Sequence, residues 1–158
     1  MLVQDLMTSP VLTIRADKAL VVVQEIMKWN HVRHVPVVGP NGQVIGIVSQ
    51  RDLLAAAHST LASDTTHADR RQHLAISDVE RVMKREVFTI GPTEPVQAAA
   101  ALMRAKRVGC LPVVEADGHL AGIITDADLV RLVEHLPTEA ARSIRTPLPR
   151  GQATPMAL

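Results

Sequence analysis

The chain has 158 residues and a formal net charge of +1, which is enough length for one compact domain and too little charge to attract nucleic acid or membranes. Hydrophobic residues make up 47% of it and aromatic residues 1%, which excludes wholesale disorder and argues against the base-stacking platforms of single-strand nucleic-acid binders. The single cysteine, the lack of a bilayer-length apolar stretch and the start MLVQDLMTSP, which is unlike a signal peptide, predict a soluble cytoplasmic protein.

Residues 1–57 predict five elements: strand, helix, strand, strand and helix. A β-rich run at Val11–Ile14 precedes Asp17, a suitable N-cap for an apolar-rich helix over Ala19–Trp29. The later elements are a buried strand at His34–Val38, a turn with an Asn-Gly pair ending at Gly42, a return strand at Val44–Val48 and a helix from Ser49 to about Ala57. Residues 58–75 are polar and rich in alanine, and we expect a helix tail followed by a flexible linker.

Residues 79–129 repeat residues 3–53 at a constant offset of 76 positions and without a gap. The copies share a Pro-Val-Val block, at Pro36–Val38 and Pro112–Val114. The second copy, residues 76–136, therefore predicts the same elements, with Thr93 as N-cap and Pro95 in the first helical turn. Residues 137–158 carry four prolines and no periodicity, and we expect them to be largely disordered.

A copy of about 50 residues is too short to bury a comfortable core alone. The two copies are therefore expected to pack against each other around a pseudo-twofold axis, with a cleft between them. The predicted fold class is α/β (α+β), built from two β-α-β-β-α repeats.

The strongest local signal is a glycine that ends a strand, followed by a hydroxyl residue and, three residues later, an aspartate. It occurs as Gly46, Ser49 and Asp52, and again in the second copy as Gly122, Thr125 and Asp128. One interpretation is a capping box at the start of a helix. The other is a ligand site, because a helix N-terminus favours phosphate and a carboxylate beside it can accept both hydroxyls of a ribose. The two interpretations are compatible.

The paired h-P-V-V and G-h-h-[S/T]-x-x-D motifs resemble those of CBS domains, the module named after cystathionine β-synthase, over about residues 1–135. The resemblance implies a tandem pair, often called a Bateman module. Such a module is a non-catalytic sensor of AMP, ADP, ATP or S-adenosylmethionine that requires no cofactor, forms a homodimer and regulates another protein. The ligand-binding residues implied for this chain are Thr13, Arg33, His34, Val35, Pro36, Ser49, Arg51, Asp52, Thr89, Leu111, Pro112, Thr125 and Asp128.

Within this set, the resemblance implies that the two aspartates hold ribose hydroxyls and that Ser49 and Thr125 contact ribose or phosphate. Thr13 and Thr89, with the backbone of the Pro-Val-Val strands, would line the adenine pockets. The copies differ in charge: Arg33-His34, Gln50 and Arg51 of the first copy correspond to Gly109-Cys110, Asp126 and Ala127 of the second. We therefore expect unequal sites, with phosphates near Arg33 and His34. The alternatives are a solvated arginine at a helix end and a satisfied, half-buried histidine.

The seven histidines do not form a metal-binding pattern, and no metal is expected. The sequence also lacks a catalytic constellation, and Cys110 has no neighbour that would activate it as a nucleophile. An enzyme acting on nucleotides is therefore disfavoured. The open alternative to a sensor is a structural dimerisation or interaction module with no nucleotide bound.

Overall fold

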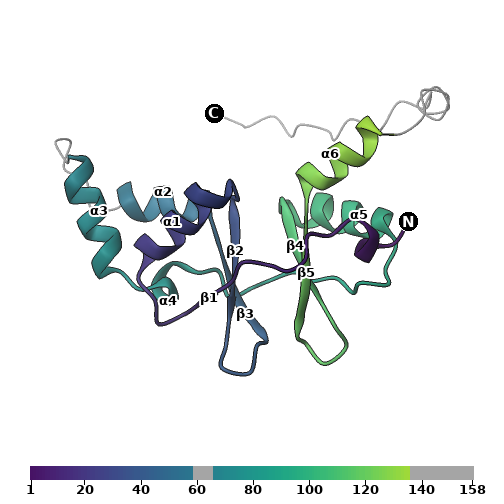
Figure 1. Ribbon diagram of the computed structural model, residues 1–158, viewed down its shortest axis with the longest axis horizontal. Helices are drawn as coiled ribbons and strands as arrows, with labels where there is room; N and C mark the ends of the chain where they lie inside the picture. The colour runs from purple at the N-terminus through teal and green to yellow at the C-terminus, as the bar shows by residue number, and fades with distance from the viewer. Residues whose placement is uncertain (59–65, 136–158) are drawn as a thin grey trace, which may run out of the picture.

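The computed structural model describes residues 1–58 and 66–135, which form two similar halves joined side by side (Figure 1). The first half contains β1 (Ile14–Arg15), α1 (Leu20–Asn30), β2 (His34–Val38), β3 (Val44–Ser49) and α2 (Gln50–His58). The second contains α5 (Val96–Lys106), β4 (Cys110–Val114), β5 (Leu120–Thr125) and α6 (Asp126–Glu134). Within the described residues, the other elements are η1 (Val3–Asp5), α3 (His67–Ile76) and α4 (Val79–Val82).

The two sheets are built alike. Strands run in the order β1-β2-β3 in the first half, with β1 parallel and β3 antiparallel to β2. In the second half β4 pairs antiparallel with β5, and a parallel bridge from Ile90 to Val113 takes the place of β1. The hairpins match position by position, since Pro36 faces Ile47 and Pro112 faces Ile123. The predicted β-α-β-β-α repeat is confirmed.

Each half is completed by the segment that precedes the other half in the sequence. Val3 is fully buried in the second core, its N–H donates to the Glu94 carbonyl at 2.8 Å, and Thr8 pairs with Ile123. In Figure 1 this purple segment starts beside α5 and crosses to the first half. Conversely, Val79 is fully buried in the first core and Lys84 pairs with Ile47. The two halves are therefore interlocked.

The same crossing segments explain why the predicted helix caps were wrong. The residues before α1 and α5 are Ala19 and Pro95, and neither makes a side-chain cap. Instead, the Leu20 N–H donates to the Ser77 carbonyl at 2.8 Å, so the backbone of the crossing segment satisfies the start of α1. Asp17 pairs with Arg15, at 3.2 Å.

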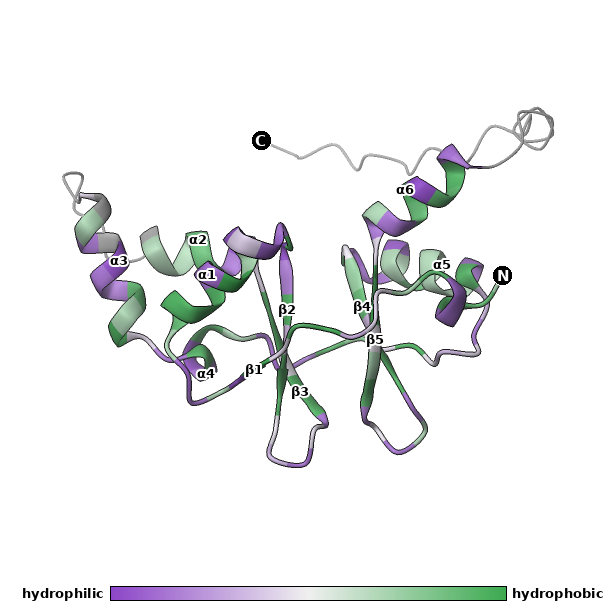
Figure 2. Cartoon of the chain, viewed as in Figure 1, coloured by the Kyte–Doolittle hydropathy of each residue, from purple (hydrophilic) through white to green (hydrophobic). Residues whose placement is uncertain are grey.

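The expected flexible linker also differs, because it contains helix α3. Thr66 and Asp69 form a capping box, with the Thr66 N–H donating to Asp69 Oδ2 at 2.8 Å. Leu74 is 1% exposed and packs into the first core, although most of α3 is hydrophilic (Figure 2). The expected disordered tail and residues 59–65 lie outside the described residues. Within the described ranges, no helix has the length and hydropathy that a membrane crossing requires.

Candidate functional site

A cleft of about 620 Å³ opens between the two halves. The first half contributes the ends of β2 and β3 and the first turns of α2. The second half contributes the start of β4, the loop before it and the first residue of α6, while residues 84–88 run between the halves. The lining residues are Arg33, His34, Ile47, Ser49, Gln50, Arg51, Asp52, Leu54, Lys84, Glu86, Val87, Phe88, Arg107, Val108, Gly109, Cys110, Pro112 and Asp126.

Asp52 is fixed at the edge of this cleft by the start of α2. Its Oδ2 accepts hydrogen bonds from the Ser49 N–H, at 2.8 Å, and from the Ser49 hydroxyl. The Asp52 N–H in turn donates to Ser49 Oγ at 3.2 Å. These bonds form a capping box and hold the carboxylate in one orientation.

The other oxygen of Asp52 meets a cation. Lys84 Nζ lies 3.1 Å from Asp52 Oδ1, and the Asp52 side chain is 13% exposed. Burial alone would raise the pKa of Asp52, but the hydrogen bonds from Ser49 and Lys84 outweigh it and lower that pKa. The cleft therefore holds an ionised, oriented carboxylate beside an exposed ammonium group.

Asp128 has the same arrangement at the start of α6. Its Oδ2 accepts from the Thr125 N–H at 2.8 Å and from the Thr125 hydroxyl at 2.7 Å, while Oδ1 lies 3.8 Å from Arg131 Nη1. Thr125 and Asp128 do not line the cleft that contains Asp52. The repeated motif thus produces two similar carboxylates in different surroundings.

Charged groups of both signs meet where the halves approach. Arg33 Nη2 lies 3.6 Å from Asp126 Oδ1, and both side chains are about 60% exposed. Burial lowers the pKa of His34, and the nearby Asp126 charge opposes that shift. Burial also raises the pKa of Cys110 to about 12, so this thiol stays protonated near neutral pH.

The cleft brings part of the predicted site together. Arg33, His34, Ser49, Arg51, Asp52 and Pro112 line it. Val35, Pro36 and Leu111 are buried within the strands, Thr13 is half-buried before β1, and Thr89 is exposed beside Ile90. The roles predicted for these residues stay predictions.

The sequence interpretation missed several cleft residues, above all Lys84, Arg107 and the segment Glu86–Phe88. Lys84 lies beside Asp52 because its segment crosses to the first half. The signal was present in the repeat, since residues 84–88 correspond to residues 8–12, but the alignment does not show to which half such a segment belongs.

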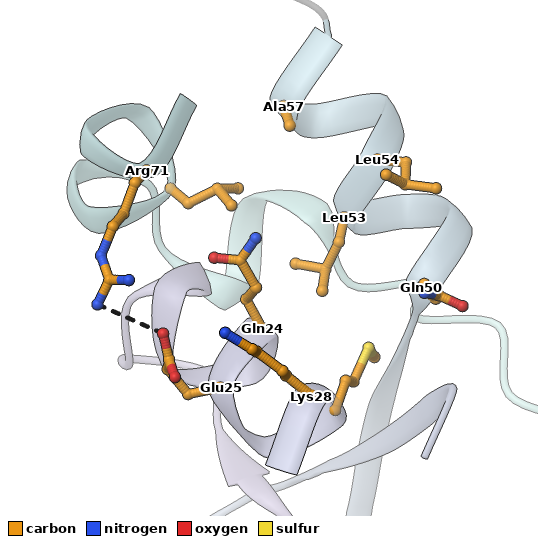
Figure 3. A pocket seen from close by; sticks show the side chains of 10 residues that line it. Gln24, Glu25, Lys28, Gln50, Leu53, Leu54, Ala57 and Arg71 are labelled. Carbon is orange, nitrogen blue, oxygen red and sulfur yellow. Dashed lines mark ion pairs between the residues drawn. The ribbon is translucent and has the colours of Figure 1, made fainter. Parts of the chain in front are cut away.

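A second cavity, of about 500 Å³, lies between α1, α2 and α3 (Figure 3). Leu53, Leu54 and Ala57 contribute apolar surface, and Glu25 Oε1 pairs with Arg71 Nη2 at 3.4 Å across its edge. In neither cavity, nor elsewhere in residues 1–58 and 66–135, do three or more His, Cys, Asp or Glu side chains gather as a metal site would require.

The family model of the CBS domain matches residues 3–59 and 76–135 of this chain. A CBS domain-containing protein of Dictyostelium discoideum is 36% identical over 132 residues, covering 84% of this chain and 90% of that protein. A homoserine O-acetyltransferase of Methanococcoides burtonii is 34% identical over 83% of this chain, but the match spans only 24% of that protein.

Solved structures show the same architecture. A putative acetoin utilization protein from Vibrio cholerae has a TM-score of 0.72 and 32% identity, covering 92% of this chain and 98% of its own. The CBS domain pair of protein MJ0100, solved with 5′-methylthioadenosine and S-adenosyl-L-methionine, has a TM-score of 0.71 and 25% identity, over 85% and 96%. CBSX2, solved with AMP, has a TM-score of 0.69 and 26% identity, over 92% and 99%. With both repeats matched by the family model and the fold shared, the chain belongs to the CBS domain family and is a tandem CBS pair.

Proposed function

We propose that this CBS pair is a non-catalytic regulatory module whose inter-repeat cleft binds an adenosine-containing ligand. The observation that carries the proposal is the Asp52 carboxylate, which Ser49 orients at the edge of a cavity large enough for a nucleotide. Structural neighbours solved with AMP and with S-adenosyl-L-methionine support this class of ligand.

The carboxylate has the geometry that a ribose requires. Oδ2 is committed to the start of α2, while Oδ1 pairs with the exposed ammonium of Lys84. A ribose diol that donates to Oδ1 would replace a weak ion pair with charge-assisted hydrogen bonds. Lys84 would then be free to contact a phosphate of the same ligand.

The cations around the cleft favour a phosphate-bearing ligand over a neutral nucleoside. Arg33, Arg51, Lys84 and Arg107 line the cleft, against the carboxylates of Asp52, Glu86 and Asp126. Arginine suits phosphate because its planar guanidinium can donate two parallel hydrogen bonds.

Regulation would follow from the position of the site. A ligand held by residues from both halves binds best in one relative placement of those halves and increases its population. A separate regulated protein would respond to that placement. The proposal includes a cytoplasmic location, because a single cysteine suits a reducing compartment.

We further propose that the chain forms a homodimer through its outer helices. Leu54 on α2 and Val130 on α6 occupy equivalent positions in the two repeats and are 54% and 59% exposed, and Val133 is 64% exposed. Exposed apolar side chains that recur at matching positions favour a shared interface.

The test is a thermal-shift and calorimetry panel with AMP, ADP, ATP, S-adenosylmethionine and NAD. A ligand at a hundred times its dissociation constant should add about 2.7 kcal/mol of stability. For a domain of this size the melting temperature should rise by roughly 5–10 °C. No shift with any of these ligands at millimolar concentration would contradict the sensor and favour a structural dimerisation module.

A further inference from the structure

Where the two halves approach each other, a carboxylate occupies space that an anionic ligand would need. Asp126 is the first residue of α6 and reaches Arg33 of the other half, with 3.6 Å between Asp126 Oδ1 and Arg33 Nη2. Both residues line the cleft. One of the arginines that line the cleft therefore already faces an internal anion.

The backbone around Asp126 leaves room for this arrangement. A Cβ at Gly109 would lie 3.2 Å from Asp126 Oδ2 and 3.8 Å from His34 Cε1. The Asp126 carboxylate thus packs beside the glycine and close to the imidazole. Its charge also acts on both neighbouring titratable groups, favouring the protonated forms of His34 and Cys110.

The Arg33–Asp126 ion pair has no counterpart at the equivalent positions of the repeat. The repeat places Gln50 at the position equivalent to Asp126 and Gly109 at the position equivalent to Arg33. The ion pair is therefore a departure from the internal symmetry. Both partners are more than half exposed, so the pair contributes little to stability and a ligand can open it easily.

We propose that Asp126 sets how much negative charge the cleft accepts, by occupying Arg33 until an anionic ligand displaces it. This inference rests on the proposed function and adds a residue that determines charge preference. A phosphate can contact the Arg33 guanidinium only after the Asp126 carboxylate has moved aside. The displaced carboxylate stays close enough to repel further phosphates. The penalty grows with the number of phosphates and is absent for an uncharged nucleoside.

The experiment compares Asp126→Asn with the wild-type chain by calorimetry at fixed ionic strength. The probes are adenosine, AMP, ATP and inorganic tripolyphosphate. We expect the variant to bind ATP and tripolyphosphate about tenfold more tightly, AMP about threefold more tightly, and adenosine with unchanged affinity. Glu115→Gln is the control, because it removes one negative charge from an exposed turn outside the cleft lining and should change none of these affinities.

A second comparison tests the route through Arg33. In an Arg33→Gln background, Asp126→Asn should increase the affinity for ATP and tripolyphosphate much less than it does in the wild-type chain. An equal increase in both backgrounds would overturn the displacement model. Unchanged affinity of Asp126→Asn for ATP and tripolyphosphate would also overturn it, including the case in which neither protein binds them. If tripolyphosphate binds and responds to Asp126→Asn while no nucleoside or nucleotide does, the adenosine proposal fails and the role of Asp126 stands.

Discussion

Asp52 and Asp128 each commit one oxygen to the start of a helix and present the other to a basic side chain. Helix capping by itself does not require a place in a cavity, since Asp69 caps α3 in the same way and lines neither of the two cavities. Asp69 can therefore be used to measure the stability that a capping aspartate contributes in this chain. This comparison allows ligand binding and helix stability to be separated at Asp52.

Asp52→Asn should weaken the binding of an adenosine ligand by about ten- to a hundredfold, because the neutral amide makes weaker bonds to ribose hydroxyls. The melting temperature should fall only slightly, since loss of a cap costs on the order of 1 kcal/mol. Calorimetry and a thermal melt on the same samples measure both effects.

Asp69→Asn is the matched control for this prediction. It changes the same chemical group in the same type of capping box, on a helix that does not line the cleft. Its stability loss should be equal or smaller, because Asp52 is less exposed and also pairs with Lys84, and its ligand affinity should equal that of the wild type. Equal affinity losses in the two variants would attribute the Asp52 effect to folding and remove the ribose assignment.

At the scale of elements, the strands and the four main helices were predictable because their signals are local. The apolar β-rich runs, the Asn-Gly and Asp-Gly turns and the Ser49–Asp52 spacing depend on neighbours in the sequence. The starts of α1 and α5 were not predictable in the same way. Their first N–H groups bond to carbonyls of Ser77 and Met1, which belong to segments that cross from the other half. The same crossing explains why Lys84 was missed as a cleft residue.

The ends of α1 and α5 offer an element-scale prediction, because both stop at a non-glycine residue in the left-handed region. His31 has φ 54° and Arg107 has φ 56°. A side chain costs roughly 1–2 kcal/mol in this region, and replacing it with glycine removes that cost. Glycine also raises the entropy of the unfolded chain, which offsets part of the gain in stability. His31→Gly should therefore raise stability by about 0.5–1 kcal/mol, measured by denaturant unfolding.

Arg107→Gly provides the comparison for the helix-end prediction. It relieves the same conformation but removes a cation that lines the cleft. Stability should rise by a similar amount, whereas affinity for phosphate-bearing ligands should fall only in this variant. A loss of stability in both variants would show that the two side chains make contacts worth more than the backbone cost.

At the scale of the whole molecule, the two repeats of the sequence are not the two cores of the structure. Residues 2–8 pack on the second half and residues 78–84 on the first, through buried side chains and backbone pairs at both places. Each crossing segment is therefore in contact with the half that it does not precede in the sequence. Lys84, which lies beside Asp52 in the cleft, belongs to one of these crossing segments.

Val3→Ala tests this interlocking, because Val3 is 0% exposed and belongs to the second core despite its position at the start of the chain. Loss of its two methyl groups should cost about 2 kcal/mol. Hydrogen exchange should then accelerate in β4 and β5 while β2 and β3 keep their protection, since the second half opens first. Val79→Ala, the equivalent position 76 residues later and also 0% exposed, should do the reverse and loosen β2 and β3. If the halves were instead built from contiguous stretches of sequence, Val3→Ala would loosen β2 and β3, so the location of the faster-exchanging amides distinguishes the two arrangements.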